Sequence, residues 1–480
     1  MSRKSYLIVL LCMVVFMSAL QAYNNYLFQN IHINYKNDYA VALYDITRNP
    51  ALFNTGSDHD YNLYRVYSGL SENGFQRTFD PAMNRTYSAS YFNFKQLNKK
   101  SSLGAAVIFD LSKHYDEYGS LEKIFYDHYF SFADTTVGNT TYYGPRLWII
   151  YNRDVSERVK TALQIDYGIE RGLKDVYTEC MTVFRNVNVK LGVSYLSPDG
   201  SLISGIYGRY FNRQGKYEAV DDLIDAINYT YIGYHVYRPE NPRSINNKSD
   251  WATGYETGIH FRKENLLVKG FGLSSVMFLG TTENRIKTGS ISKPVMVGYW
   301  VREAFRLENR LSYKIDAIRS EFGLVYNFSQ CVDWAKHGQF EVNLLDYNSR
   351  SFDMGLELIT NPFRVLTIKA GYYTGASDIK YNEYTADFLF DDRLEDSQFS
   401  MDVRWQINSI SNFLVGYENT TAEPYFYWET SKFNIQNAYL AWDRLFVFGR
   451  VGIKFDAGIW DPRGSAKTID HYGFGISLSR

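Results

Sequence analysis

The chain alternates apolar and polar residues over long stretches. Residues 399–408, FSMDVRWQIN, place an apolar side chain at every odd position and a polar one at every even position. The same period of two runs through 445–460 (LFVFGRVGIKFDAGIW), 163–169 (LQIDYGI) and 187–195 (VNVKLGVSY). Successive side chains of a β-strand point to opposite faces of the sheet, so this period predicts amphipathic strands.

The length of these strands favours one of two architectures. A soluble sandwich or propeller uses strands of about five or six residues, whereas a transmembrane barrel needs strands of about 9–11 residues that are apolar outside and polar inside. The clearest stretches here reach nine residues or more, and we find no repeated unit of the kind that propeller blades show. The sequence therefore predicts an all-β fold, a single transmembrane antiparallel β-barrel of about 14–18 strands.

Parity along the strands also predicts which side chains face the lumen. Val403 belongs to the apolar face of its stretch and is expected to face lipid, because a slip of one residue would turn its charged neighbours into hydrocarbon. Five charged side chains on the polar faces are expected to point into the lumen: Asp402, Arg404, Arg450, Lys454 and Asp456.

The last residues form one more amphipathic stretch. Tyr472, Phe474, Ile476 and Leu478 alternate with glycine and serine. We expect the bulky face to contact lipid and the strand to pair with the first one, because an open edge in hydrocarbon leaves backbone groups unsatisfied. Barrels of this class commonly end in an aromatic residue, whereas this chain ends in Ser479 and Arg480.

The N-terminus has the layout of a secretory signal peptide over residues 1–22. A short basic start, MSRK, precedes the apolar run YLIVLLCMVVFMSAL, and small residues lie near Ala22. Only Cys180 and Cys331 lie beyond this segment, and nothing in their spacing predicts a disulfide. Together with the barrel pattern, export predicts a bacterial outer-membrane location.

The composition is rich in aromatic residues, and the balanced charge argues against nucleic acid as a partner. The chain has 42 Tyr and 32 Phe, and clusters such as TTYYG (140–144) and AGYYTG (370–375) fall near apparent strand ends, where membrane barrels carry aromatic girdles. A formal net charge of -1 shows no basic excess that would indicate nucleic acid.

The intervals 112–139 and 221–250 are predicted to be long loops.

A segment before the first strand resembles a known family. Asn49, Pro50 and Ala51 follow ALYD in an exported N-terminus, and this triplet resembles the Asn-Pro-Ala element of the FadL-like outer-membrane barrels. The resemblance implies an N-terminal hatch inside the lumen, here residues 23–58 ahead of a barrel at 59–480, and a ring of 14 strands. The overall layout is also similar to uncharacterised outer-membrane barrels of Bacteroidetes-type bacteria. The alternative for Asn49-Pro50 is an ordinary turn.

The search for chemistry predicts no enzyme, no cofactor and no metal site. GLSSV (272–276) lacks the last glycine of a nucleophile elbow, and the eight histidines show no HExxH spacing. His260 is the one candidate for a barrel-wall catalytic site, with lumen lining as the favoured alternative. The acidic stretches EAVDDLID and DDRLED have oxygen ligands for Ca²⁺ but no EF-hand spacing, so solvated loops are the commoner explanation.

We therefore expect passage or binding of a small, partly hydrophobic solute through a plugged barrel, as the family resemblance implies. The alternative is a structural barrel that serves as a platform for a surface or secretion protein. A barrel-wall enzyme is third. Outer-membrane lipid is an expected partner of all three.

Overall fold

The computed structural model describes residues 48–53, 60–74, 77–123, 129–176, 180–218, 228–240, 248–266, 268–288, 295–408, 410–423, 432–447, 449–462 and 468–479. The predicted signal peptide (1–22), most of the predicted hatch (23–58) and the stretch EAVDDLID apart from its first residue lie outside these ranges. Among the described residues, no helix is long and apolar enough to cross a membrane.

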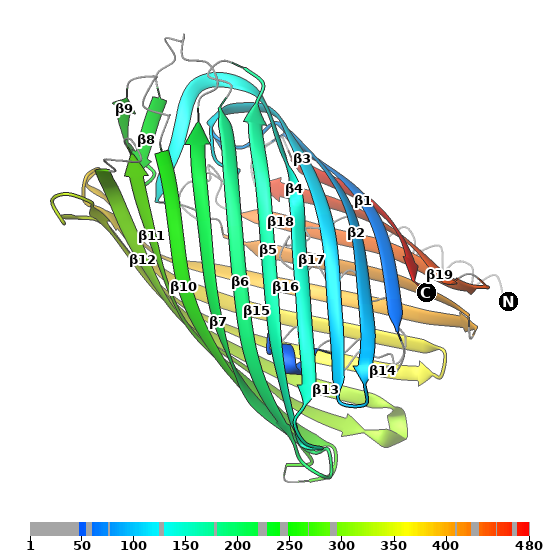
Figure 1. Ribbon diagram of the computed structural model, residues 1–480. Coiled ribbons are helices and arrows are strands. Elements are labelled where there is room, and N and C mark those ends of the chain that lie inside the picture. The colour runs from blue at the N-terminus through cyan, green and yellow to red at the C-terminus, as the bar shows by residue number, and fades with distance from the viewer. Residues whose placement is uncertain are drawn as a thin grey trace.

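The structure is a closed antiparallel β-barrel (Figure 1). Each strand pairs with its sequence neighbour, except that β7 pairs with β10 around the inserted hairpin β8–β9. The last strand, β20, pairs with β1 from Leu63↔Ser479 to Asn73↔Ile469 and closes the ring. Since β8 and β9 are not members of the ring, 18 of the 20 strands form the barrel. This number falls within the predicted range but exceeds the 14 implied by the FadL-like resemblance.

Strands in the first half of the chain, with one 3₁₀ helix before them, have the following bounds: η1 (Pro50–Leu52), β1 (Tyr61–Asn73), β2 (Met83–Asn98), β3 (Ser101–Ser120), β4 (Phe130–Asp154), β5 (Val159–Lys174), β6 (Met181–Leu196), β7 (Leu202–Glu218), β8 (Asn228–Ile232), β9 (Val236–Glu240) and β10 (Lys248–Glu264). The remaining elements are β11 (Phe271–Thr288), β12 (Val295–Ile315), η5 (Asp316–Ile318), β13 (Ser320–His337), β14 (Asn343–Phe363), β15 (Leu366–Glu383), β16 (Phe388–Asn408), β17 (Ser411–Ala422), β18 (Phe433–Phe446), β19 (Gly449–Pro462) and β20 (Ile469–Ser479).

The outward face of the ring carries an apolar band. Leu191 on β6 and Leu356 on β14 keep 61% and 66% of their surface exposed. Large apolar residues that point outward in the same way are exposed on every side of the barrel. An apolar surface of this extent is unfavourable in water, and in a membrane-spanning barrel it is the surface that lipid covers. The bulky face of the last strand belongs to it, because Tyr472, Phe474 and Ile476 are exposed.

The two ends of the barrel differ. At one end the strands are joined by short turns, such as residues 99–100 and 364–365, and at the other end by longer segments, including 121–129 and 219–247. We call these the turn end and the loop end. The strands continue well beyond the apolar band at the loop end, where their outward faces become polar, as in Asp378 and Lys380 on β15 and Arg393 on β16.

Two predicted loops are largely strands. The interval 112–139 was expected to be a loop, but residues 112–120 continue β3 and residues 130–139 begin β4. The interval 221–250 contains the β8–β9 hairpin and the first residues of β10. DDRLED (391–396) lies within β16 and not in a loop. These stretches do not follow a period of two because parts of them pack against protein on both faces, and Asp391–Asp396 extends beyond the apolar band.

Candidate functional site

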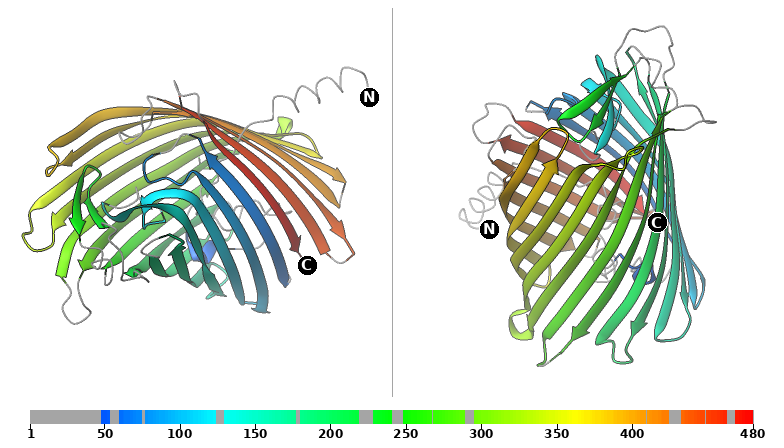
Figure 2. Two further views of the ribbon diagram at one scale, coloured as in Figure 1. Left: turned by 90° about the horizontal axis from the view of Figure 1, so that it is seen from above. Right: turned by 90° about the vertical axis from the view of Figure 1, so that its left-hand side faces the viewer.

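The end of β3 bends away from the barrel wall. Its pairing with β4 shifts register between His114 and Glu117 and again between Tyr118 and Ser120. Gly119 lies in the left-handed region at φ 65°, and a Cβ there would approach the Asp134 carbonyl oxygen to 2.7 Å. Such irregularities re-aim a strand. The chain therefore leaves the wall here, and β4 begins inside the ring (Figure 2, left, cyan).

The β8–β9 hairpin adds to this inner part of β4. Residues Phe130–Asp134 of β4 pair with Asn228–Ile232 of β8. The Gly233 N–H donates to the Tyr129 carbonyl oxygen at 2.6 Å and fixes the turn of the hairpin. We use the name inner bridge for the described residues 121–123, 129–134 and 228–240.

Glu383 on β15 holds the tip of the hairpin. Its carboxylate accepts hydrogen bonds from the backbone N–H groups of Tyr234, His235 and Val236 at 3.1–3.2 Å. It also accepts one from the Tyr381 hydroxyl at 2.7 Å and lies 3.0 Å from His235 Nδ1. Glu383 is fully buried. In the ring β4 is the fourth strand and β15 the thirteenth of 18, so the inner bridge joins opposite walls of the barrel.

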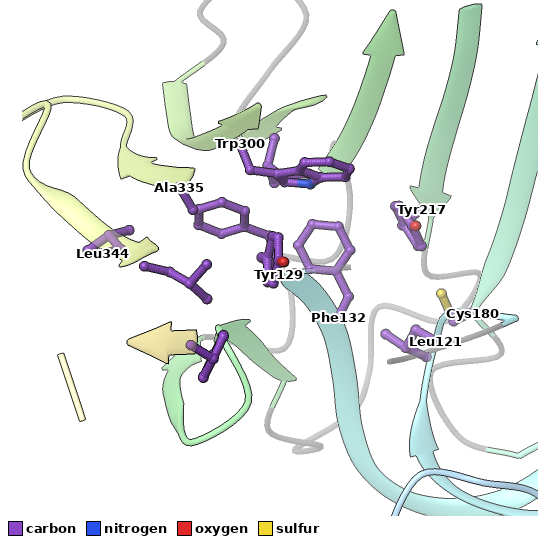
Figure 3. Close-up of a cluster of buried hydrophobic side chains, with 12 residues drawn as sticks. Leu121, Tyr129, Phe132, Cys180, Tyr217, Trp300, Ala335 and Leu344 are labelled. Atoms are coloured by element: carbon purple, nitrogen blue, oxygen red, sulfur yellow. The ribbon is translucent and has the colours of Figure 1, made fainter. Parts of the chain in front are cut away.

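An apolar cluster fills the space between the bridge and these walls (Figure 3). Tyr129 meets Trp300 edge to face at 5.7 Å, and Phe132 meets Tyr217 at 4.7 Å between ring centroids. Such pairs add to the energy of burial. The buried members come from the bridge, from the residue before β6, and from β7 and β11–β15: Leu121, Tyr129, Phe130, Phe132, Cys180, Tyr217, Ile286, Trp300, Ala335, Leu344, Leu345 and Tyr381.

Charged groups tie the bridge to the wall at three further points. Tyr129 donates a 2.6 Å hydrogen bond to Asp333 on β13. Lys174 on β5 forms a fully buried ion pair with Asp134 at 2.8 Å. The Lys248 ammonium donates to Thr230 Oγ1 at 2.8 Å. Removing one partner of a buried charged contact leaves the other uncompensated, so these ties hold the bridge in one position.

Two ionisable groups of this region lie outside the spanning strands and have shifted pKa values. Burial and then the nearby Asp250 raise the pKa of the Glu122 carboxyl to about 8. The Tyr217 hydroxyl donates to this carboxyl at 2.6 Å. Burial raises the pKa of the Cys180 thiol to about 12, which makes it unreactive at neutral pH. Cys180 and Cys331 are both free thiols.

Near the turn end, residues 48–53 run along the inner face of the wall, and we call them the lumen strap. Arg48 lies over the Phe278 ring at 5.0 Å and 3.8 Å from Glu256. Asn49 is fully buried and donates from Nδ2 to the carbonyl oxygens of Val193 and Ile206 at 3.0 and 3.3 Å.

The rest of the strap follows from Asn49. Its side-chain oxygen accepts from the Ala51 N–H at 2.9 Å and caps the short helix η1, which begins with Pro50. Phe53 then packs edge to face on Trp148, 5.3 Å between centroids, in a cluster with residues of β1–β4. The strap thus contacts β11 at one end and β2–β4 at the other.

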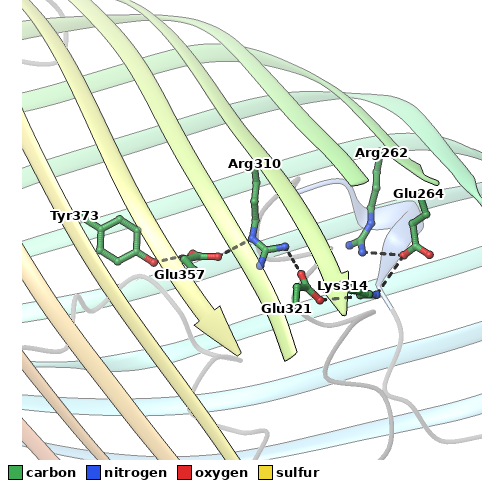
Figure 4. Close-up of polar contacts among 7 residues, drawn as sticks. All are labelled: Arg262, Glu264, Arg310, Lys314, Glu321, Glu357 and Tyr373. Atoms are coloured by element: carbon green, nitrogen blue, oxygen red, sulfur yellow. Dashed lines mark hydrogen bonds and ion pairs between the residues drawn. The ribbon is translucent and has the colours of Figure 1, made fainter. Parts of the chain in front are cut away.

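The wall between β10 and β15 is lined by a chain of charged contacts (Figure 4). Arg310 donates to Glu357 at 2.6 Å and to Glu321 at 2.8 Å. Glu357 also accepts from the Tyr373 hydroxyl at 2.7 Å. Lys314 lies 3.8 Å from Glu321 and 4.0 Å from Glu264, which accepts from Arg262 at 3.1 Å. These side chains can hydrogen-bond to water, and the three cations among them balance the three carboxylates.

Four of the five predicted lumen residues make contacts of the same type, on β16 and β19. Tyr439 donates to Asp402 at 2.5 Å, and Arg450 donates to Asp443 at 2.8 Å. Lys454 lies 3.6 Å from Asp456, which His471 approaches at 3.4 Å. Arg404 lies between Thr367 and Leu414 in the register of the sheet. These groups belong to the wall and are not brought together as one site.

His260 has no catalytic arrangement around it. The side chain is buried on β10 beside Gly205, and neither ring nitrogen has a hydrogen-bond partner among the described residues. Within the same described part of the chain, no group of three or more His, Cys, Asp and Glu side chains is placed to hold a metal ion.

Sequence reasoning placed Asn49–Ala51 in a candidate hatch but missed the inner bridge. The available signal is a run of aromatic residues, YTYIGYHVY (229–237), inside the interval predicted to be a long loop. Glu383 had no signal at all, because its partners are backbone groups almost 150 positions away.

No protein-family model matches the sequence, and no curated protein matches it. Solved structures that the chain is similar to include the unliganded ferric citrate transporter FecA, at 10% identity and a TM-score of 0.45, with 88% of this chain and 79% of that chain covered. The FrpB iron transporter of Neisseria meningitidis is 8% identical at a TM-score of 0.44, covering 91% of this chain and 82% of its own.

The TodX monoaromatic hydrocarbon channel is 11% identical at a TM-score of 0.31, covering 90% of this chain and 92% of its own. None of these similarities shows a family for this chain, and the barrel follows from the pairing of its own strands. No family is assigned, so the FadL-like resemblance stays a prediction.

Proposed function

We propose that this protein is a restricted solute channel of a bacterial outer membrane, with the inner bridge as its constriction. The observation that carries the proposal is the anchoring of the hairpin tip by Glu383 on the wall opposite β4. A bridge between opposite walls narrows the lumen at the loop end. In barrels of this class the longer loops lie outside the cell, so a solute would meet the bridge first.

The wall chemistry favours a small polar solute over the partly hydrophobic one expected from the family resemblance. Below the bridge, inward positions on β10–β15 carry paired charges such as Arg310 with Glu357 and Glu321. A polar solute can exchange its water for these groups, whereas an apolar one gains nothing from them. The lumen strap, 48–53, would be the described part of an N-terminal hatch (23–58) that rests in a barrel formed by residues 59–480.

The experiment compares the intact protein with a variant in which a short Gly-Ser linker replaces residues 228–240. Both are reconstituted into liposomes, and heat-modifiable gel migration verifies that each barrel is folded. A restricted channel predicts faster liposome swelling in small sugars and amino acids for the variant. Recovery of the mature protein as a soluble periplasmic protein would overturn the membrane location.

A platform for a partner protein is the second candidate. It is favoured by the polar outward faces of β14–β16, which stand beyond the apolar band, and by the apolar cluster that joins the walls beneath them. In that case both liposome preparations stay impermeable. No catalytic arrangement supports an enzyme in the described part of the chain.

A further inference from the structure

On one side of the barrel, cations mark the loop-end edge of the apolar band. Moving along each strand from the band toward the loop end, the first outward residue is Arg85 beyond Tyr87 on β2 and Lys113 beyond Leu111 on β3. On β5 and β6 the equivalent positions are Arg171 beyond Ile169 and Arg185 beyond Val187. We call Arg85, Lys113, Arg171 and Arg185 the basic arc.

The cations of the arc are placed in pairs. Arg85 and Lys113 are direct cross-strand partners, and both lie over the ring of Tyr115, at 5.8 and 5.0 Å. Arg171 and Arg185 are diagonal neighbours, because Arg185 pairs with Ile169, two residues from Arg171. Like charges at such positions destabilise a sheet. An arrangement that holds them together is stabilised by an anion between them.

In the part of the chain that the structure describes, no acidic side chain supplies that anion. Among the described residues, none of the four cations has a carboxylate within ion-pair distance, and three of them are exposed while Lys113 is half-buried. Outward cations further from the band are different, since Arg285 pairs with Glu283 and Lys380 with Asp391.

The same level of the barrel is acidic on the neighbouring side. The first outward residues beyond the band are Glu72 on β1, Asp470 on β20 and Asp461 on β19. The charges above the band are therefore unevenly distributed: four of the first outward cations lie on β2–β6, and one further cation, Arg350 beyond Phe352, lies on β14. A uniform polar rim that served only solubility would not segregate the charges in this way.

We propose that the basic arc binds the phosphate groups of lipid headgroups in the leaflet at the loop end. Residues next to the apolar band lie at headgroup depth, where lipid phosphates are the abundant anions. Arginine binds phosphate through two parallel N–H bonds, and the paired cations match a headgroup with more than one phosphate. This inference goes beyond the channel proposal and requires only that a bilayer surrounds the apolar band.

The test measures lipid retained by the purified full-length barrel. Protein in neutral detergent is mixed with a bis-phosphorylated glycolipid (lipid A) or with the same glycolipid after removal of its phosphates, and bound lipid is measured by native mass spectrometry. The wild-type protein should retain the phosphorylated form. The variant R85Q/K113Q/R171Q/R185Q should lose affinity by about fivefold for each cation removed, and added salt should weaken wild-type binding.

The matched control removes the same charge elsewhere. K216Q/R285Q/K380Q/R393Q neutralises four outward cations that lie three or more outward positions beyond the band, and it should bind as the wild type does. Equal retention of the dephosphorylated lipid, or undiminished binding by the arc variant, would overturn the proposal. If the fourfold variant does not give a heat-modifiable barrel, R171Q/R185Q is measured in its place. Failure of the channel proposal leaves this measurement unaffected.

Discussion

The phenol of Tyr129 donates a 2.6 Å hydrogen bond to Asp333, 204 positions later in the chain. Asp333 is also bound by Arg302, whose Nε and Nη2 donate to the carboxylate at 3.0 and 2.6 Å. Because Tyr129 belongs to the inner bridge and Asp333 to β13 in the wall, this hydrogen bond helps to hold the bridge against the wall.

Tyr129→Phe should loosen the bridge without unfolding the barrel. A hydrogen bond to a charged group contributes about 2 kcal/mol, and Arg302 keeps Asp333 paired in the variant. Hydrogen exchange of residues 129–134 should become roughly tenfold faster or more. Tyr384→Phe is the control, because Tyr384 donates to Asp346 at an exposed position outside the bridge. Equal exchange in wild type and Tyr129→Phe would show that the contact does not hold the bridge.

Glu383→Ala should release the tip of the hairpin and widen the constriction. The substitution leaves the N–H groups of Tyr234, His235 and Val236 without their acceptor, at about 1–3 kcal/mol for each group that stays buried. Single-channel conductance in a planar bilayer should therefore rise. Glu395→Ala, on the exposed outward face of β16, should leave it unchanged. A conductance unaffected by Glu383→Ala would contradict the assignment of the bridge as constriction.

The bridge should be weaker at high pH because of Glu122. Its pKa is about 8 in the folded protein against an ordinary value of 4.5. Since the folded value is the higher one, the folded state holds the proton more tightly. The stabilisation is therefore fully present below pH 4.5 and is lost as the pH rises through about 8.

Hydrogen exchange of residues 129–134, corrected for the intrinsic rate, should show a less protected bridge at pH 9 than at pH 6. Glu122→Gln cannot ionise and should remove most of this difference. The assignment fails if the wild type and Glu122→Gln respond to pH in the same way.

Val403→Arg and Arg404→Val should differ sharply, although both change one residue of β16. By parity Val403 lies in the apolar band, where an arginine at mid-membrane costs about 2–4 kcal/mol, whereas a lumen position tolerates change. The first variant should assemble poorly and the second should give a folded, heat-modifiable barrel. The two are compared in the same membrane preparation, and equal tolerance would mean that the faces are misassigned.

Asn49→Asp should detach the lumen strap. The change removes both N–H donors and turns a carboxylate toward the carbonyl oxygens of Val193 and Ile206, at a cost of about 1–3 kcal/mol. Exchange at residues 48–53 should become faster while the barrel stays heat-modifiable. Asn98→Asp, at the exposed end of β2, should have no such effect. A strap that stays protected in Asn49→Asp would mean that these two bonds do not anchor it.

The alternation along the strands was enough to predict a barrel and the two faces of its strands. A period of two is a local property, and it requires no knowledge of what each face contacts. It therefore predicted that Tyr472, Phe474 and Ile476 would be outward, and closure through the last strand followed from the need to satisfy every backbone group in lipid.

The inner bridge, in contrast, depends on contacts between segments far apart in the sequence. Residues 112–139 carry no period of two that distinguishes lumen from lipid, because parts of this stretch pack on protein from both sides, so they appeared to be a loop. The anchoring of His235 by Glu383 joins residues 148 positions apart. A bond of that kind depends on which walls the closed ring sets opposite each other. No local pattern encodes that distance, because it arises from the strand count and the pairing of the whole barrel.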